Sequence, residues 1–296
     1  MKIGETEIQE TFAEAFPMHF VNLIITAADE HWLNAALNEV TGYSASVISC
    51  DAETGISTRL DPVDTPDGRI GAEVLVFGFS ADALQKAVPN RVGQCVMTCP
   101  STAVYDGNPD SEVRIGLGKQ IRFFGDGFQK AKMVADRRYW RIPVMDGEFL
   151  VQDTLNVGRG VGGGNIIFQS SCKTAALAAA RRGAEAVAAC KGVIAPFPGG
   201  VARSGSKVGS VYKALPASTA EAYCPTLRGR VESKLLAETV AAFEIVVDGV
   251  DEETVANGMA VAARAVAGDC ILQIGAGNYG GELGKYHFHL HEILGS

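Results

Sequence analysis

The chain has 296 residues, of which 47% are hydrophobic and 20% are charged, and its formal net charge at pH 7 is −8. This composition is typical of a folded protein long enough for two domains, and it excludes wholesale disorder. Basic residues are scattered along an acidic chain, so we expect no nucleic-acid partner. No apolar run approaches the roughly 20 residues that span a bilayer. The acidic start lacks a signal-peptide pattern, so we expect no membrane partner and a cytoplasmic location.

The first half of the chain predicts the order strand–helix–strand twice. Apolar residues of the first helix recur at helical spacing up to Val40, and Ser80 is a suitable N-cap for the second helix. The polar run Asp51–Ile70 between the two repeats is expected to be a loop. The expected strands are His19–Ala27, Tyr43–Cys50, Ala72–Phe79 and Cys95–Cys99, and the second expected helix is Ala81–Val92.

The second half predicts a similar order after a region of hairpins at Lys119–Val157. Its first helix is the alanine-rich Cys172–Lys191, and Asp251 is expected to cap its second helix. The expected strands are Asn165–Gln169, Val193–Ala195, Phe243–Val247, Cys270–Ile274 and Lys285–Glu292. We therefore predict an α+β fold of two ferredoxin-like β-α-β-β-α-β lobes, residues 1–147 and 148–296, that arose by internal duplication and carry hairpin insertions.

The segment Ala195–Thr226 is rich in proline, glycine and serine and shows neither a helical nor a strand period. Such a long ordered loop more often carries a site than a core. Within it, Gly200 to Lys207 resembles a phosphate-binding P-loop, but the order Gly-Ser-Lys places the lysine and the hydroxyl wrongly. Two alternatives remain for Lys207: it binds another anionic or carbonyl group, or it is a solvated surface lysine.

Two G-x-G-x-x-G patterns, starting at Gly158 and Gly275, each lead into an expected strand rather than a helix. Dinucleotide binding needs the helix, so neither pattern is taken as a nucleotide site.

Three histidines, His287, His289 and His291, alternate with apolar residues on one expected strand. Imidazole is a common zinc ligand, but same-face neighbours on a strand lie about 7 Å apart. An exposed polar face is the favoured interpretation, and a metal site is the alternative. The seven cysteines form no C-x-x-C pair, so we expect no metal ligation and interpret most of them as small buried hydrophobic residues.

Glu244 interrupts the apolar strand Phe243–Val247. A carboxylate there must be paired, protonated or directed into a cleft, and burial would raise its pKa toward that of a useful acid–base group. Strand alternation that simply points Glu244 outward explains the pattern equally well. No G-x-S-x-G elbow and no nucleophile–histidine spacing is present, so a covalent nucleophile is not indicated.

Several segments resemble one family in order and nearly from end to end. They are TFAEAF (11–16), ETGI (53–56), TPDGR (65–69), GQCVMT (93–98), FFGDG (123–127), APFPGG (195–200), SKVGS (206–210), LPAST (215–219), AYCPT (222–226) and GNYGG…LHE (277–292). These segments are similar to those of the formylmethanofuran:tetrahydromethanopterin formyltransferases.

The resemblance implies transfer of a formyl group between the amine of a methanofuran-type carrier and N5 of tetrahydromethanopterin, the two carriers being substrates. It implies no permanently bound cofactor or metal, a homotetramer, and in some organisms a complex with formyl-hydrolysing subunits. Glu244 matches the glutamate that the family uses for proton transfer. The loop resemblance implies that Gly199, Gly200, Ser204, Ser206 and Lys207 line the substrate cleft, with Ser218, Thr219 and Tyr223 behind them.

Two other functions compete with this one. A non-catalytic subunit could bind the pterin carrier and hold partner subunits together, and a pterin cyclohydrolase is a third possibility. Formation of the N5-formyl product by the purified chain separates the first function from both.

Overall fold

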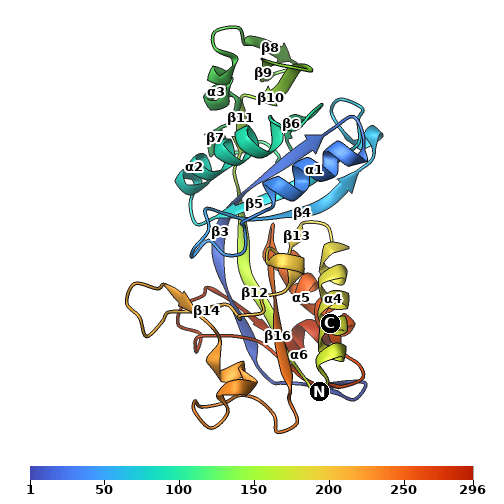
Figure 1. Cartoon of the computed structure of the whole chain (residues 1–296), viewed down its shortest axis with the longest axis vertical. Coiled ribbons are helices and arrows are strands. Elements are labelled where there is room, and N and C mark those ends of the chain that lie inside the picture. Colours follow the sequence, from blue (N-terminus) through green and yellow to red (C-terminus); the bar gives the residue numbers. More distant parts are fainter. Residues whose placement is uncertain (296) are drawn as a thin grey trace. The chain divides into compact units, whose positions relative to one another are not determined.

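The computed structural model describes residues 1–295 and has a mixed α/β fold with a large mixed sheet and six α-helices (Figure 1). The residues form two compact units: unit 1 comprises residues 1–17 and 161–296, and unit 2 comprises residues 18–160. The chain passes from one unit to the other at residues 17/18 and 160/161. These boundaries lie inside strand β3 (Phe12–Thr26) and strand β12 (Gly158–Ser170), so each of these strands has residues in both units. The predicted division at residue 147 describes halves of the sequence rather than these units, and it stays a prediction.

Unit 2 packs helices α1 (Glu30–Val40) and α2 (Ala81–Arg91) on one face of β3, β5 and β4. Leu33 and Leu37 of α1 and Leu84 of α2 are fully buried with Val21 and Leu23 of β3. The other elements are β4 (Glu53–Leu60), β5 (Gly71–Gly78), β6 (Ala103–Asp106), β7 (Arg114–Gly116), α3 (Gly118–Ile121), β8 (Lys130–Val134), β9 (Arg137–Val144), β10 (Gly147–Gln152) and β11 (Thr154–Asn156).

Two predicted segments of unit 2 are wrong near its first helix. Residues 43–50 form turns, and the strand lies instead at Glu53–Leu60, inside the run predicted as a loop. Tyr43 has a φ of 50°, and the Arg91 guanidinium donates hydrogen bonds to the carbonyls of Gly42 and Tyr43 at 2.9 and 2.8 Å. Because Arg91 satisfies these carbonyls, they are not available to a sheet ladder.

The expected strand at Cys95–Cys99 is also wrong, because α2 continues into a π-helical turn at Val92–Val96. The N–H of Met97 donates to the carbonyl of Val92, and this wider turn places Val92 and Val96 in the core. In the predicted hairpin region, residues 119–124 form α3 and a 3₁₀ turn rather than a strand, and the guanidinium of Arg122 lies 4.4 Å from the Trp140 ring centroid. The β9–β10 hairpin itself is confirmed.

Unit 1 packs helices α4 (Lys173–Ala188) and α5 (Glu252–Val266) on strands β12 and β16 (Ala241–Gly249). Phe168, Ile245 and Val247 project into this core between Ala179, Met259 and Ala262. The other elements are β1 (Lys2–Ile3), β2 (Thr6–Ile8), β13 (Val193–Ile194), β14 (Lys207–Val208), β15 (Ala217–Ser218), β17 (Ile271–Gly275), β18 (Tyr286–His289) and α6 (Leu290–Gly295).

Most strand pairs are antiparallel, and β10–β6 and β17–β2 are parallel. The predicted strand Lys285–Glu292 ends at His289, because Leu290 begins α6 and its N–H donates to the carbonyl of Thr11. The prediction of mostly buried cysteines is wrong: six are half-buried and Cys270 is exposed. Among residues 1–295, no helix combines the length and the apolar character that crossing a membrane requires.

Asp251 caps α5 as predicted. Its side chain accepts a hydrogen bond from the Thr254 N–H at 2.8 Å, and the Thr254 hydroxyl accepts one from the Asp251 N–H, which completes a capping box. Asp251→Ala leaves these end groups unpaired and is expected to lower the free energy of unfolding by about 1 kcal/mol. Urea denaturation followed by circular dichroism measures the loss; an unchanged midpoint would contradict the role of the cap.

Candidate functional site

Glu244 lies on β16, facing away from the core that Ile245 and Val247 enter. Strand alternation therefore turns it away from the helices, as the simpler interpretation of the sequence requires. It is nevertheless only 4% exposed, because the loop that follows Ala202 covers it. The backbone N–H of Ala202 donates to the carbonyl of Glu244 at 2.8 Å, which fixes the start of this loop along the edge of β16 opposite β12.

Ser206 supplies the polar partners of the buried carboxylate. Its backbone N–H donates to Oε2 of Glu244 at 2.7 Å, and its hydroxyl donates to Oε1 at 2.5 Å. Burial raises the pKa of Glu244, and the two bonds from Ser206 oppose that rise only in part. The result is a carboxyl whose pKa is higher than usual, on the wall of a cavity.

The cavity beside Glu244 has a volume of about 270 Å³. Four of the predicted site residues line it: Ser206, Lys207, Tyr223 and Glu244. A smaller cavity of about 30 Å³ shares Tyr223 and Glu244 and also touches Ser204. The remaining lining of the larger cavity consists of Asn165, Ile167, Val208, Ala220, Glu221, Ala222, Lys234, Gly277, Asn278 and Tyr279.

Lys207 is neither isolated nor fully solvated. Its ammonium group lies 2.5 Å from a carboxylate oxygen of Glu221, and both side chains are a little over a third exposed. This ion pair lowers the pKa of Glu221. The cavity therefore has a balanced charge pair beside the Glu244 carboxyl.

The other predicted site residues support the loop rather than line these two cavities. Gly199 and Gly200 lie in a 3₁₀ turn, where Gly200 has a φ of 78° and a Cβ would approach Ala184 of α4 to 2.6 Å. The Ser218 hydroxyl donates to the carbonyl of Gly209 at 2.7 Å, and Thr219 donates to the carbonyl of Ser204 at 3.1 Å. Both bonds hold the loop closed around Ser206.

Tyr279 is a site residue that sequence reasoning missed. Its hydroxyl donates to the carbonyl of Ser206 at 3.2 Å and accepts from the N–H of Val208 at 3.2 Å. Burial raises its pKa, and the nearby carboxylate of Glu244 adds to the rise. Tyr279 lies in the segment GNYGG, which contributes to the family resemblance. The residue types and spacing of this segment do not indicate a catalytic or binding role for its tyrosine.

Glu14 holds the segment that carries Tyr279. Its buried carboxylate accepts hydrogen bonds from the backbone N–H groups of Gly281, Leu283 and Gly284 at 2.8–2.9 Å, and from that of Tyr279. Although burial raises the pKa of Glu14, the four N–H donors outweigh burial and lower it to about 2. Asn165 adds a bond from the Gly277 N–H to its Oδ1 at 2.6 Å. These contacts fix residues 277–284 along one side of the cavity.

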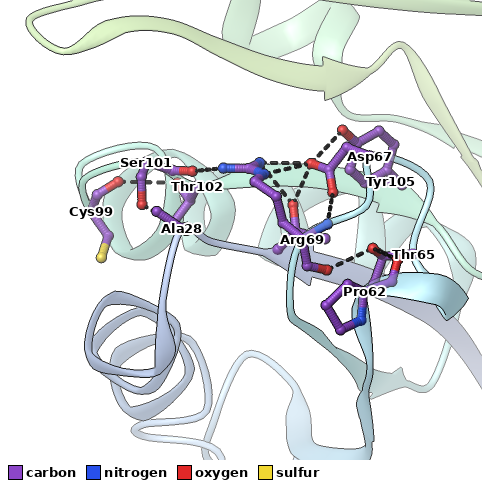
Figure 2. Close-up of polar contacts among 10 residues, drawn as sticks. Ala28, Pro62, Thr65, Asp67, Arg69, Cys99, Ser101, Thr102 and Tyr105 are labelled. Atoms are coloured by element: carbon purple, nitrogen blue, oxygen red, sulfur yellow. Dashed lines mark hydrogen bonds and ion pairs between the residues drawn. The ribbon is translucent and has the colours of Figure 1, made fainter.

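A second polar cavity, of about 360 Å³, lies in unit 2 beside the TPDGR segment. Figure 2 shows Arg69 reaching across from this segment to the Ser101 carbonyl while its guanidinium also pairs with Asp67. Tyr105 and Thr26 both donate to the same Asp67 oxygen. Burial raises the pKa of Asp67, but these donors more than compensate and lower it. Because Asp67 and Arg69 already pair with each other and with neighbouring groups, we interpret this network as one that stabilises the fold of unit 2.

The alternative interpretation of the three histidines as a metal site finds no support among residues 1–295, where no group of three or more His, Cys, Asp and Glu side chains could hold a metal ion. His287 and His289 are exposed, and each packs against Phe12. His291 lies in α6, where its Nε2 is 2.9 Å from the carbonyl oxygen of Ile8. The favoured interpretation of an exposed polar face holds for the first two histidines only.

Comparison with known proteins now identifies the chain. Residues 1–144 match the family model described as formylmethanofuran-tetrahydromethanopterin formyltransferase, and residues 147–293 match the model of that family's proximal lobe. The chain belongs to the formylmethanofuran–tetrahydromethanopterin formyltransferase family. The predicted family and the predicted activity, transfer of a formyl group between the two carriers, are confirmed.

Relatives support the assignment over the full length. A formyltransferase of this name from Methylococcus capsulatus is 48% identical over 99% of this chain and all of its own. A component of the formyltransferase/hydrolase complex of Methylorubrum extorquens is 45% identical, over 97% of this chain and 96% of its own. The solved formyltransferase of Methanosarcina barkeri superposes with a TM-score of 0.93 at 40% identity, over 99% of this chain and 100% of the other.

A second solved structure is the formyltransferase/hydrolase complex of Methylorubrum extorquens with methylofuran. One of its chains superposes with a TM-score of 0.94 at 44% identity, over 99% of this chain and 98% of that chain. Relatives of this formyltransferase thus occur both under the enzyme's own name and as a component of a larger complex.

Proposed function

We propose that this formyltransferase moves the formyl group directly from one carrier amine to the other, with Glu244 carrying the proton. The observation that supports the role of Glu244 most is its geometry: a carboxyl only 4% exposed, held by Ser206 and open to a 270 Å³ cavity. A raised pKa allows a carboxyl to accept and return protons near neutral pH.

The chemistry needs no redox change and no enzyme nucleophile. The N5 amine attacks the formyl carbon, the resulting tetrahedral oxyanion collapses, and the other amine leaves with a proton. Glu244 accepts the proton that N5 loses and returns one to the leaving amine. Alignment of two bound reactants can supply about 7–11 kcal/mol of the barrier, so a covalent intermediate is unnecessary. The enzyme accordingly works without a permanently bound cofactor.

The proposed substrate-binding residues are Gly199, Gly200, Ser204, Ser206, Lys207, Ser218, Thr219 and Tyr223. Ser206, Lys207 and Tyr223 contact the carriers at the larger cavity, and Ser204 does so at the smaller one. The turn at Gly199 and Gly200 and the bonds of Ser218 and Thr219 keep the loop in the conformation that binds them.

Ser206→Ala tests the coupling between this loop and Glu244. Loss of the hydroxyl that donates to Oε1 removes one interaction that favours the charged carboxylate. The pKa of Glu244 should therefore rise further, because one of the donors that oppose the effect of burial is gone. The acid limb of the kcat/KM pH profile should move to higher pH, and an unmoved limb would contradict the proposal.

Activity of the purified chain tests the proposed function as a whole. Given formyl-carrier and tetrahydropterin, the chain should produce the N5-formyl product, which absorbance spectroscopy detects. A carrier-binding scaffold yields no product, and a cyclohydrolase would hydrolyse the N5,N10-methenyl species instead.

We also propose that the two halves, residues 1–147 and 148–296, are ferredoxin-like lobes that arose by duplication, and that the protein is a cytoplasmic homotetramer. The two helices packed on one sheet face in each unit support the shared origin. Association with formyl-hydrolysing subunits is supported by the related component of the Methylorubrum extorquens complex. Native mass spectrometry measures the oligomer, and a pull-down from native cells that recovers only this chain would contradict the complex.

A further inference from the structure

Two cysteines far apart in the sequence lie side by side at one end of the unit 1 sheet. Cys172 precedes α4, and Cys270 precedes β17. The hydroxyl of Ser170 donates to the carbonyls of both, at 2.9 Å to Cys172 and 2.8 Å to Cys270. The Ser171 N–H also donates to the Cys270 carbonyl at 3.0 Å. These bonds bring the two backbones together, and the Cys270 side chain is near enough to contribute to the lowered pKa of Cys172.

The surroundings of Cys172 favour its thiolate. It is the N-cap residue of a 16-residue helix, where backbone N–H groups and the helix dipole stabilise a negative charge. Its sulfur lies 3.1 Å from the Thr174 hydroxyl. Hydrogen bonds from the Thr174 side chain, the Ala175 and Thr174 N–H groups and the Cys270 thiol lower the pKa of Cys172.

Exposure distinguishes Cys270, and a lowered thiol pKa distinguishes Cys172, from the other cysteines. Cys270 is exposed, and Cys172 is half-buried like the remaining five. By contrast, burial raises the pKa of Cys95, Cys99 and Cys190, which makes their thiols poor nucleophiles. Cys270 has a φ of 65°, in the left-handed region that favours glycine.

We propose that Cys172 and Cys270 form a thiol-oxidation site, in which Cys172 reacts with a peroxide and Cys270 resolves the product to a reversible disulfide. No step of formyl transfer requires this site, and the proposal does not depend on the function proposed above.

The reaction is balanced with peroxide as the two-electron oxidant. The Cys172 thiolate attacks one peroxide oxygen, the O–O bond breaks, and the departing hydroxide takes a proton to become water. Cys172 is then a sulfenic acid. The Cys270 thiolate, its proton released to solvent, attacks that sulfur; an S–S bond forms, the S–O bond breaks, and a second water leaves. A small thiol reductant reverses the disulfide by exchange.

Peptide mass spectrometry of the full-length protein tests the site. The protein is treated with hydrogen peroxide, its free thiols are blocked with N-ethylmaleimide, and it is digested with trypsin. Cys172, Cys270 and Cys190 fall on separate peptides, 160–173, 265–285 and 183–191. We expect peptides 160–173 and 265–285 to be linked by a disulfide. The linked pair should have the summed mass of the two peptides less the hydrogens lost in forming the S–S bond, and dithiothreitol should separate it. The Cys172 thiol should disappear at least about tenfold faster than that of Cys190.

Two variants make the test specific. In Cys270→Ser the sulfenic acid should persist on Cys172 and be trapped by dimedone. In the matched control Cys190→Ser, at the far end of α4, the cross-link should form as in the parent protein. Alkylation of Cys172 and Cys270 at the same rate as Cys190, or a cross-link that joins other cysteines, would overturn the proposal.

Discussion

Replacing Glu244 by Gln is expected to reduce the turnover number about a hundredfold or more while leaving the affinity for both carriers near normal. The replacement keeps the size of the side chain and its contacts: a Gln can accept from the Ser206 N–H and donate to the Ser206 hydroxyl, in place of the two bonds that the carboxylate accepts. It cannot take up the proton that N5 releases. The loss should therefore fall on kcat, measured under saturating carriers, with binding measured by calorimetry.

The matched control is Glu238→Gln, which changes an exposed carboxylate and should leave both quantities unchanged. If turnover of the Glu244 variant survives intact, the acid–base role is wrong. If affinity falls as much as turnover, Glu244 positions a carrier instead of transferring a proton.

The same variant has a signature in stability. Because burial raises the pKa of Glu244 above its ordinary 4.5, the folded protein holds this proton more tightly than the unfolded chain. The contribution of Glu244 to the free energy of unfolding is therefore most favourable below pH 4.5 and is lost as pH rises through the raised pKa. Since Gln has no charge to desolvate, the variant should gain stability relative to the parent as pH rises.

Replacing Glu14 by Gln is expected to lower the free energy of unfolding by about 3–5 kcal/mol at neutral pH. The carboxylate accepts four backbone N–H groups from residues 279–284, whereas an amide has one oxygen and turns its own N–H₂ toward the remaining donors. Urea denaturation measures the loss. Activity should fall as well, because the same segment positions Tyr279 against the Ser206 loop.

The pH dependence identifies the cause of this loss. The pKa of Glu14 is lowered to about 2, so its stabilisation is complete above the unfolded value near 4.5 and is lost as pH falls toward 2. The difference between parent and variant should therefore shrink below pH 4.5. The control is Glu10→Gln, which changes an exposed glutamate in the N-terminal segment just before β3, the strand that carries Glu14. A difference that stays constant down to the lowest pH at which both proteins fold would exclude the charged network as its source.

The two glutamates show what the sequence could and could not predict. A charge inside an apolar strand singled out Glu244, and strand alternation correctly turned it away from the helices. Its burial could not be predicted, because Ser206, 38 residues earlier in the chain, covers it. Glu14 gives the same signal inside FAEAF and was missed, because its partners lie at residues 279–284 at the other end of the chain.

The wrongly predicted elements have a similar cause. Tyr43–Cys50 has strand-like residues, but Arg91 satisfies the carbonyls at its start. Cys95–Cys99 is apolar enough for a strand, but core packing of Val92 and Val96 favours continuation of α2 as a π-turn. The local pattern was sufficient for the long helices and central strands, where periodicity and the caps at Ser80 and Asp251 agree with tertiary packing.

Direct transfer is most directly tested by a single-turnover experiment in which the protein is mixed with isotope-labelled formyl-carrier and no acceptor, then quenched and weighed by intact-protein mass spectrometry. The account predicts that the protein mass stays unchanged, and that adding tetrahydropterin carries the label straight to the N5-formyl product. Label that stays on the protein as a formylated side chain, and that the pterin then removes at the rate of turnover, would contradict it.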